Sequence, residues 1–309
     1  MADGYVINDT TYAGEVASQF IVKSLTGADT IGGGHIYVKD GIKKLFTIPR
    51  WDANYEDFIQ DRKPTPVTKG SFVVDARTLD PQDHMIYTEF NPRDFEDHWY
   101  ATQLNQTLID RSLPYSVESV MVQGVLSRYA KWLNKMIWNG DTTGTGIYKY
   151  FNGIITRAVA DSAVPKVTSP IALTAGNIVS KFQAGYDMLD ASIRYDLDLK
   201  YFVSYKTYDL YDQAQENQTN KGKDFTQRGK DSYKGIKVVK VADFPDDCFL
   251  IAKGSASNKS NLWIGLNSVA DEGLQLQKLQ ANSELYFIKM LAKADVNYGW
   301  AEEMVLYKA

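Results

Sequence analysis

The 309-residue sequence has few of the residues that form disulfides or bind metal ions, since it contains one cysteine and three histidines. A single cysteine excludes a disulfide framework within one chain. Cys248 lies within the apolar stretch 247–251, which favours a small buried hydrophobic residue over a nucleophile. His35, His84 and His98 are far apart, and none has a second histidine or cysteine at the spacing of metal ligands. The sequence therefore predicts no disulfide, metal site or cofactor.

Long hydrophobic runs and an excess of basic charge are also missing. No stretch approaches the ~20 consecutive apolar residues of a membrane span, and residues 1–5 lack the basic and apolar regions of a secretory signal. We therefore expect no membrane contact and a protein made and kept in a cytoplasm. The formal net charge is −4, whereas a dedicated nucleic-acid binder carries a basic excess that releases counterions from phosphate. Tight DNA binding is not expected.

Motifs of nucleotide and nucleophile chemistry are absent as well. A phosphate-binding loop needs Gly-x-x-x-x-Gly-Lys-Ser/Thr, and the nearest segment, 139–146, follows an expected helix and lacks the lysine. A Gly-x-Ser-x-Gly elbow does not occur, although a Ser/His/Asp site assembled from distant residues stays open. Nothing in the sequence nominates a nucleophile.

Carboxylates occur in groups that could serve acid-base catalysis or bind calcium. Arg93 lies within the main group, which favours a solvated or ion-paired face over a catalytic pair. Three other aspartates lie in expected loops without the ligand spacing of a calcium site. The main group is Glu89, Asp94, Glu96 and Asp97, and the three others are Asp40, Asp61 and Asp231. We predict that the chain is not an enzyme, and a soluble hydrolase with an acidic cleft is the remote alternative.

Aromatic side chains, in contrast, are abundant, with 20 tyrosines and an aromatic content of 13%. Rigid aromatic side chains are favoured at large protein contact surfaces. Hydrophobic residues make up 44% and charged residues 23%, which is typical of folded, soluble domains. The composition favours a protein that assembles over one that catalyses a reaction.

The N-terminal part predicts an arm followed by a first β-hairpin. Residues 1–34 mix small, polar and scattered apolar residues and end in three consecutive glycines, which form a flexible joint. We expect a strap-like arm there. The segments 36–42 and 43–48 are both rich in apolar residues, and Asp40-Gly41 lies near the point where they join. Asp-Gly between apolar runs is a strong hairpin signal. We expect the chain to turn back at Asp40-Gly41.

Residues 49–71 predict a long projection. Two prolines make the segment 63–70 extended, and the run 72–74 is typical of a strand. Two strands joined by a long exposed excursion form a projecting arm, whose aromatic residues need a partner outside their own domain. The alternative is a long surface loop folded on its own body. The candidate contacts to a neighbouring subunit are Trp51, Tyr55, Phe58, Ile59, Arg62 and Lys63.

The clearest helix extends from Ser116 to Asn139. Its apolar residues recur at helical spacing in two adjacent stripes, which predicts a broad buried face. At about 1.5 Å per residue the helix spans about 35 Å, the length of a small domain. We expect it to be a structural spine. The first stripe is Met121, Val125, Tyr129, Trp132 and Met136, and the second is Val122, Leu126, Leu133 and Ile137.

The rest of the chain predicts a mixed α/β region and closing strands. A second helix is expected from Thr174, with its inner face at Ile178, Phe182, Leu189 and Ile193, and a polar helix at 207–215. Strands are expected at 201–203, 236–239, 249–251 and 262–264, with a polar stretch at 217–234. The closing strands are expected at 285–291, 296–300 and 304–307. A terminal segment that is this apolar is usually docked in a sheet.

In this order, the expected elements resemble the major capsid proteins of tailed bacteriophages, which have the Hong Kong 97 fold. The run Met-Ile-Trp-Asn-Gly-Asp at 136–141, followed by Asn-Gly-Ile at 152–154, is similar to the end of the family's spine helix and the opening of its next domain. Phe-Thr-Ile-Pro at 46–49, with 70–72 and 79–81, is similar to the two sides of the family's extended loop. The resemblance covers nearly the whole chain and depends on the order and spacing of short motifs.

The resemblance implies an α+β fold of the Hong Kong 97 type. By position, residues 1–42 are the N-terminal arm, 43–90 the extended β-hairpin loop, 91–140 the peripheral domain with the spine helix, 141–270 the α/β axial domain and 271–309 the closing strands of the peripheral domain. The implied function is that of a major capsid protein, which self-assembles into the icosahedral shell around the double-stranded DNA genome.

The same resemblance implies binding partners and an alternative function. The chain is expected to form pentamers and hexamers with copies of itself, in a virion capsid that is assembled in the bacterial host cytoplasm together with a portal and decoration proteins. Many family members carry an N-terminal scaffolding segment that is removed during maturation. This chain has no such helical, charged prefix, so a separate scaffolding protein is expected unless the sequence is already trimmed. DNA is enclosed without sequence-specific binding. The alternative is an encapsulin-like compartment that encloses an enzyme.

Overall fold

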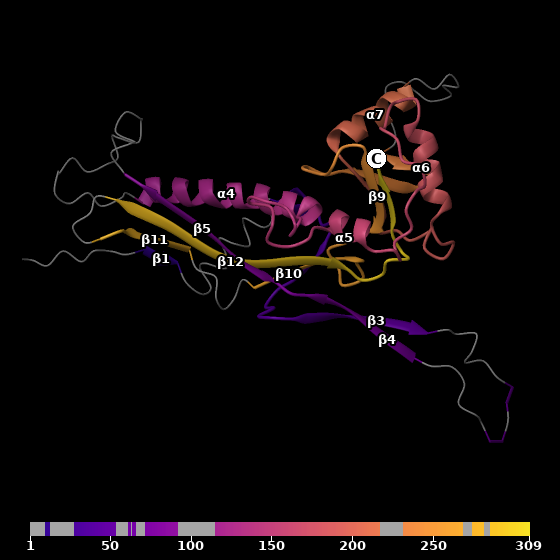
Figure 1. Cartoon of the computed structure of the whole chain (residues 1–309), viewed down its shortest axis with the longest axis horizontal. Coiled ribbons are helices and arrows are strands. Elements are labelled where there is room, and N and C mark those ends of the chain that lie inside the picture. The colour runs from indigo at the N-terminus through magenta and orange to yellow at the C-terminus, as the bar shows by residue number, and fades with distance from the viewer. Residues whose placement is uncertain are drawn as a thin grey trace, which may run out of the picture.

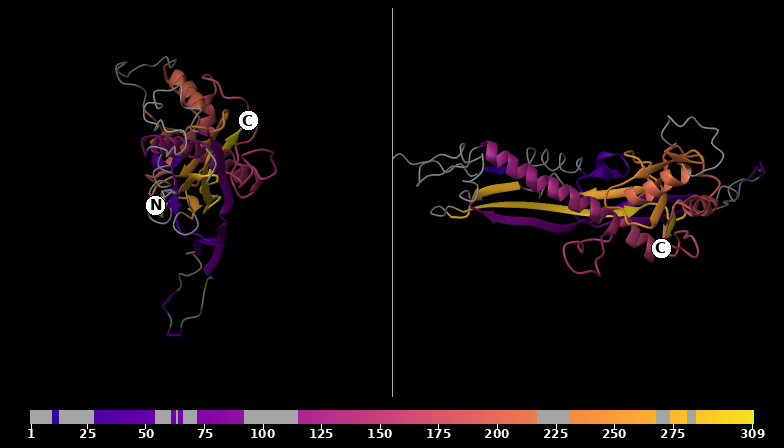
Figure 2. Two further views of the ribbon diagram at one scale, coloured as in Figure 1. Left: turned by 90° about the vertical axis from the view of Figure 1, so that its left-hand side faces the viewer. Right: turned by 90° about the horizontal axis from the view of Figure 1, so that it is seen from above.

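The computed structural model describes residues 10–12, 28–53, 61–62, 64–65, 72–91, 115–216, 231–267, 274–280 and 285–309. Within them, the chain forms an elongated molecule with three parts: a long sheet with a helix along it, an α/β body at one end, and a hairpin that projects from the same end of the sheet (Figure 1). Two further views show that the hairpin points away from both the sheet and the helix (Figure 2).

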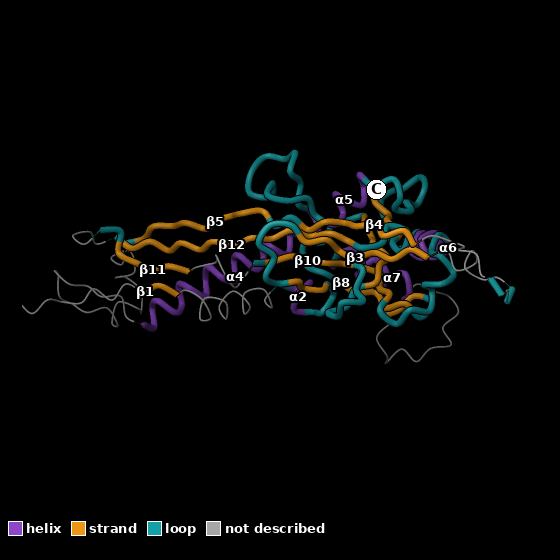
Figure 3. The backbone as a smooth tube through the Cα atoms, turned by 90° about the horizontal axis from the view of Figure 1, so that it is seen from below, coloured by secondary structure: helices purple, strands orange, loops and turns teal. Residues whose placement is uncertain are grey.

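The long sheet is organised around β12 (Tyr286–Tyr298), a strand of 13 residues. β5 (Gln82–Phe90) pairs with one edge of β12, and β11 (Leu274–Lys278) and β10 (Leu262–Leu266) pair in succession with the other edge. β1 (Thr10–Tyr12) extends the sheet beside β11, and β2 (Tyr37–Lys39) lies parallel to β10. Figure 3 shows β5, β12, β11 and β1 side by side.

Two expectations for this sheet are wrong. The two strands expected at 285–291 and 296–300 are the single strand β12, because β5 and then β10 keep its backbone paired along its length. The hairpin expected at Asp40-Gly41 is not formed. Gly41 does adopt the positive φ of a turn, +78°, but the strand before it pairs with β10, and Ile42 N donates to Leu266 O at 3.0 Å.

The expected spine helix is confirmed as α4 (Tyr115–Asn139). Its buried face is centred on the second of the two predicted stripes, since Val122, Leu126, Leu133 and Ile137 are all buried. These side chains pack in one core with buried residues of β12 and of the five-stranded sheet. Met121, Val125 and Trp132 are only partly buried at its margin. The helix ends at Asn139, and at the following Gly140 a Cβ atom would collide with the carbonyl oxygen of Phe151.

The α/β body contains a five-stranded sheet in the order β13-β9-β6-β8-β7. α6 (Ile178–Asp187) and α7 (Tyr205–Glu216) cover one face, where an aromatic cluster includes Phe182, Tyr201, Phe249 and Tyr307. The end of α4 covers the other face, where the Trp138 and Phe202 ring centroids are 5.4 Å apart. The strands are β6 (Leu199–Val203), β7 (Ser232–Tyr233), β8 (Ile236–Lys240), β9 (Cys248–Lys253) and β13 (Val305–Lys308).

The expectations for this body are mostly confirmed. The strands expected at 201–203, 236–239 and 249–251 are β6, β8 and β9, and the polar helix is α7. The C-terminal strand is docked, since β13 pairs with β9. The second helix is shorter than expected and ends at Asp187, although Leu189 and Ile193 beyond it are buried as predicted. Most of the polar stretch 217–234 lies outside the described residues. The domain boundaries stay predictions.

The projecting hairpin consists of β3 (Phe46–Ala53) and β4 (Phe72–Leu79). The two strands are antiparallel, in a register that pairs Phe46 with Leu79 and Ala53 with Phe72. Among the described strands, each of the two pairs only with the other. The expected strand at 72–74 is therefore part of a longer one. At the base of the hairpin, Ile48 and Leu79 are buried in a small apolar cluster with Ile42 and Trp263.

Candidate assembly surfaces

Two of the six residues predicted to contact a neighbouring subunit are described, and both belong to the hairpin. Trp51 lies in β3, and its backbone is paired with Val74 of β4. Arg62 lies in the segment that joins the two strands and is exposed. Tyr55, Phe58, Ile59 and Lys63 lie outside the described residues, so their role as contacts stays a prediction. The two strands predicted on either side of these residues are confirmed.

A polar cluster holds the base of the hairpin to the body. Arg77 of β4 forms an ion pair with Asp161, whose Oδ2 lies 2.6 Å from an Arg77 amine nitrogen. The same Oδ2 accepts a hydrogen bond from Tyr298 OH at 2.9 Å. Burial alone raises the pKa of Asp161, but hydrogen bonds from Arg77, the Ala163 N–H and Tyr298 outweigh it and lower that pKa to about 2. The Asp161 carboxylate therefore stays ionised below the pH at which an ordinary aspartate takes up a proton.

The long sheet has one face that α4 leaves uncovered. Side chains alternate along β5 and β12, so every second residue points away from the helix. On that outer face, Met85, Tyr87 and Leu291 expose 53%, 46% and 38% of their surface. Tyr87 lies beside Phe287, with ring centroids 5.9 Å apart. An exposed apolar group of this kind is typical of a contact surface. The sequence shows the alternation, but it does not show which face α4 covers.

A loop at the end of the α/β body exposes two apolar side chains almost completely. Tyr195 is 90% exposed and Leu197 is 98% exposed. The loop that presents them is held in place: Asp196 accepts from the Asp198 N–H at 3.1 Å and forms an ion pair with Lys253 at 3.0 Å. A rigid loop that presents apolar groups to solvent is a second candidate contact. Sequence reasoning missed it, because the neighbouring aspartates indicate only a loop.

The N-terminal arm is fixed to the spine helix through α2 (Asp29–Gly32). The N–H and Oγ1 of Thr30 both donate to Asn134 Oδ1, at 3.0 and 2.6 Å. Trp138 Nε1 donates to Thr30 Oγ1 at 2.8 Å, and Asn134 Nδ2 donates to Ala242 O at 2.6 Å. Asp29 accepts from the Ala242 N–H at 2.9 Å. Because Thr30, Asn134 and Trp138 are buried, their hydrogen bonds define one position for α2. The chain is therefore fixed to the spine helix at this point.

His84 lies between the long sheet and α4. Its Nδ1–H donates to Gln82 O at 3.1 Å, so its Nε2 accepts from Tyr129 OH at 2.9 Å. The ring is 8% exposed and lies 4.8 Å from the Trp132 ring, measured between centroids. Burial lowers the pKa of His84 to about 4. The arrangement stabilises a neutral imidazole, as expected of a structural histidine.

The other residues considered for chemistry also serve packing or local structure. Cys248 is buried, as predicted, and burial raises the pKa of its thiol to about 12. Burial and the charge of Lys200 lower the pKa of His35 to about 4. Glu89 is exposed and accepts from Tyr87 OH at 2.6 Å. His98 and the rest of the carboxylate group lie outside the described residues. The described residues contain no group of three side chains that could hold a metal ion.

Solved structures of capsid shells have the same arrangement of elements. A chain from the capsid of an empty GTA particle superimposes with a TM-score of 0.62 at 10% identity, over 92% of this chain and 90% of that chain. The capsid of Myoviridae phage XM1 superimposes with a TM-score of 0.60 at 9% identity, over 99% of this chain and 95% of that chain. A chain of a virus-like particle from Pyrococcus furiosus superimposes with a TM-score of 0.53 at 9% identity, over 96% of this chain and 99% of that chain.

A long helix along a long strand, an α/β body and a projecting hairpin thus define the class: the chain has the fold of phage capsid proteins. The resemblance to the Hong Kong 97 fold and the α+β class are confirmed. At identities of 9 to 10%, the likeness concerns the fold. No family model and no curated protein match the sequence. None of the described helices combines the length and the apolar character needed to cross a membrane.

Proposed function

We propose that this chain is a major capsid protein, whose copies assemble as pentamers and hexamers into an icosahedral shell around the double-stranded DNA of a tailed bacteriophage. The observation that carries the proposal is the β3–β4 hairpin, which leaves the body with only its base in a described apolar cluster. A ribbon of two strands is marginally stable by itself. Its length therefore serves a contact outside its own subunit.

The division of the molecule fits the demands of a shell. One sequence must occupy five-fold and six-fold rings, which requires a rigid unit for curvature and extended segments that bind neighbours. The sheet of the α/β body, covered on both faces, is the rigid unit. The hairpin and the predicted N-terminal arm are the proposed extended segments. Contacts of this kind bury area that no single subunit buries alone, so the shell is more stable than any one pairwise contact.

The proposal includes the contents, the partners and the absence of catalysis. A net charge of −4 favours enclosure of DNA by confinement over tight binding. A separate scaffolding protein, a portal and decoration proteins are the proposed partners, with assembly in the host cytoplasm. A structural role without enzymatic activity is supported by buried titratable groups that are engaged in packing, such as His84 and Cys248.

Electron microscopy of the purified chain tests the proposal. The chain is expressed alone and with a candidate scaffolding protein, and light scattering is recorded on the same samples. We expect closed shells or large rings in at least one of the two samples. A stable monomer in both contradicts the proposed function.

A shell that encloses protein in place of a genome is the second candidate. It is supported by the similarity to a virus-like particle from a cellular organism, Pyrococcus furiosus. Particles isolated from the cells that naturally make this chain distinguish the two candidates. Nuclease-protected double-stranded DNA inside the particles supports the phage capsid. A stoichiometric protein cargo without DNA supports the compartment.

A further inference from the structure

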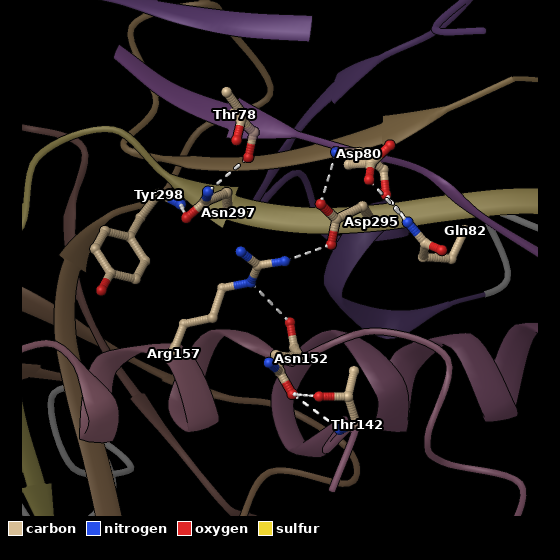
Figure 4. A network of polar contacts seen from close by, with 9 residues as sticks. All are labelled: Thr78, Asp80, Gln82, Thr142, Asn152, Arg157, Asp295, Asn297 and Tyr298. Carbon is tan, nitrogen blue, oxygen red and sulfur yellow. Dashed lines mark hydrogen bonds and ion pairs between the residues drawn. The ribbon is translucent and has the colours of Figure 1, made fainter. Parts of the chain in front are cut away.

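The corner between β4 and β5 decides the direction in which the hairpin leaves the molecule, because β4 belongs to the hairpin and β5 to the long sheet. Side chains of β12 hold the backbone of this corner (Figure 4). Asp295 Oδ2 accepts from the Asp80 N–H at 2.9 Å, and Asn297 Nδ2 donates to Thr78 O at 2.8 Å. Within the corner, Gln82 Nε2 donates to Asp80 O at 3.0 Å. The hairpin exit is thus tied to the long strand by directional bonds.

Arg157 of α5 (Ile154–Ala160) connects this corner to the body. Its Nη2 lies 2.7 Å from Asp295 Oδ1, whereas the Asp80 N–H of the corner donates to the other oxygen, Oδ2. Its Nε donates to Asn152 O at 3.0 Å, and Asn152 Oδ1 in turn accepts from the Thr142 N–H at 2.9 Å. Figure 4 shows Arg157 reaching from α5 to β12 between these two partners. One guanidinium therefore joins three elements: the hairpin corner, β12 and the loop after α4.

Asp295 is the buried centre of this network, since its side chain is only 3% exposed. Burial raises the pKa of Asp295, and Arg157 together with the N–H groups of Asp80 and Val296 opposes this rise. A buried ion pair adds little net stability compared with apolar packing, but it accepts only a narrow range of geometries. The network is better suited to define a direction than to stabilise the fold.

Apolar packing does not define that direction on this side of the base. The small apolar cluster around Ile48, Leu79 and Trp263 lies at the hairpin base. Beside Arg77, Arg157 and Asp161 the base borders an open pocket of about 590 Å³. A hairpin whose base borders an open, solvent-filled pocket on one side can tilt unless polar bonds hold it.

We propose that Arg157 and Asp295 are positioning residues that fix the angle between the β3–β4 hairpin and the body, and thereby the curvature of the assembled shell. The inference rests on the proposed function. A strand of 8 residues extends about 26 Å. A tilt of about 10° at the base moves its far end by about 4.5 Å, which exceeds the rise of about 3.3 Å per residue of a strand. Such a tilt changes which residues of a neighbour the hairpin meets.

The test removes the ion pair without leaving a charge buried alone. In the double variant Arg157→Gln/Asp295→Asn, the asparagine still offers an oxygen to the Asp80 N–H. We expect the double variant to fold and to lose the single particle diameter of the wild type in electron micrographs, giving a mixture of larger, smaller and open particles. The matched control is Asp83→Asn/Lys293→Gln, which removes another ion pair, of 3.1 Å, between β12 and the start of β5 beside the corner. The control should keep the wild-type diameter.

A second measurement reads the angle in the unassembled chain. Spin labels on Ala53→Cys, at the end of β3, and Gln213→Cys, exposed on α7, report the distance between hairpin and body. Cys248 is buried and remains unlabelled. We expect a narrow distance distribution in the otherwise wild-type chain and in the control, and a broadened or shifted one with Arg157→Gln/Asp295→Asn. The single variant Arg157→Lys keeps the charge but loses the second hydrogen bond, so its distance distribution should be broader than that of the wild type and narrower than that of the double variant.

The outcomes separate the inference from the proposed function. Unchanged particle diameter in the double variant, or an unchanged distance distribution, overturns the inference while wild-type shells keep the proposed function. A wild-type chain that never forms shells overturns the proposed function, and the curvature part of the inference with it. If the double variant does not fold, Arg157→Lys with the spin labels decides: a distribution identical to that of the wild type contradicts the positioning role.

Discussion

The hairpin and the five-stranded sheet are both built from short strands, yet they differ in what covers them. In β9, five consecutive residues from Cys248 to Ala252 are buried, because helices cover both faces of the sheet. At the hairpin base, Ile48 and Leu79 are buried while Thr47 and Thr78 beside them are exposed. The difference indicates that the body holds the fold together, and under the proposed function the hairpin has its partners in neighbouring subunits.

The largest effect on subunit stability is expected in the covered region. Leu133→Asp places a charge at a position of α4 that is 0% exposed and removes a side chain from the main core. We expect a loss of about 4 kcal/mol or more in the free energy of unfolding, because the carboxylate has no partner there. Denaturant unfolding followed by circular dichroism measures the loss.

The control for this variant lies on the same helix. Gln123 is exposed on α4, so Gln123→Asp changes the charge without burying it. We expect the control to shift the free energy of unfolding by at most about 0.5 kcal/mol. An unchanged midpoint for Leu133→Asp contradicts the buried face assigned to α4.

The spine helix was predictable from the sequence because its signal is local. Apolar residues at helical spacing over 25 residues leave few alternatives to one long helix. The short apolar strands β6, β8 and β9 were predictable for the same reason. Their pairing was not: the Asp40-Gly41 turn signal predicted a hairpin, but β2 pairs with β10, more than 200 positions later in the sequence. Local turn chemistry carries no information about so distant a partner.

Of the three candidate contact surfaces, the projecting hairpin was predictable from the sequence and the other two were not. The projection was visible from the prolines and charged residues between two strands. The exposed group around Met85 and Leu291 was not, because alternation along a strand is the same whether α4 covers one face or the other. Tyr195 and Leu197 look like ordinary loop residues in the sequence. Only the surrounding structure shows that nothing in the described part of their own subunit covers them.

A smaller effect on the covered region is expected from pH. The folded pKa of His84 is about 4, below its ordinary 6.5, so the unfolded chain takes up the proton first. Stability contributed by neutral His84 is present above about pH 6.5 and is lost as the pH falls towards 4. The loss is on the order of 3 kcal/mol.

Comparison with one variant isolates this contribution from other titrating groups. His84→Gln retains a donor for Gln82 O and an acceptor for Tyr129 OH but does not titrate. Urea unfolding between pH 7 and pH 4, a range chosen to bracket the window, should show a steeper loss for the wild type than for His84→Gln. Parallel curves contradict the structural role assigned to the neutral imidazole.

The smallest effect on subunit stability is expected at the exposed loop of the body. Tyr195→Ser/Leu197→Ser removes two side chains that are 90% and 98% exposed, so the free energy of unfolding should change by at most about 0.5 kcal/mol. If the loop is a contact, the same variant assembles poorly in light scattering. Tyr205→Ser, which removes a half-exposed tyrosine from α7, is the control. Equal assembly of both variants and the wild type excludes this loop as a contact.

The comparison between the hairpin and the body is tested most directly by replacing the hairpin tip. Residues 59–69, predicted to form the tip, are exchanged for a short Gly-Ser linker, and loop closure depends only weakly on length. We predict cooperative unfolding and far-ultraviolet circular dichroism like those of the wild type, together with no closed particles in electron micrographs. Normal shells from this variant, or collapse of the subunit itself, would contradict the account of the hairpin as an assembly element separate from the fold.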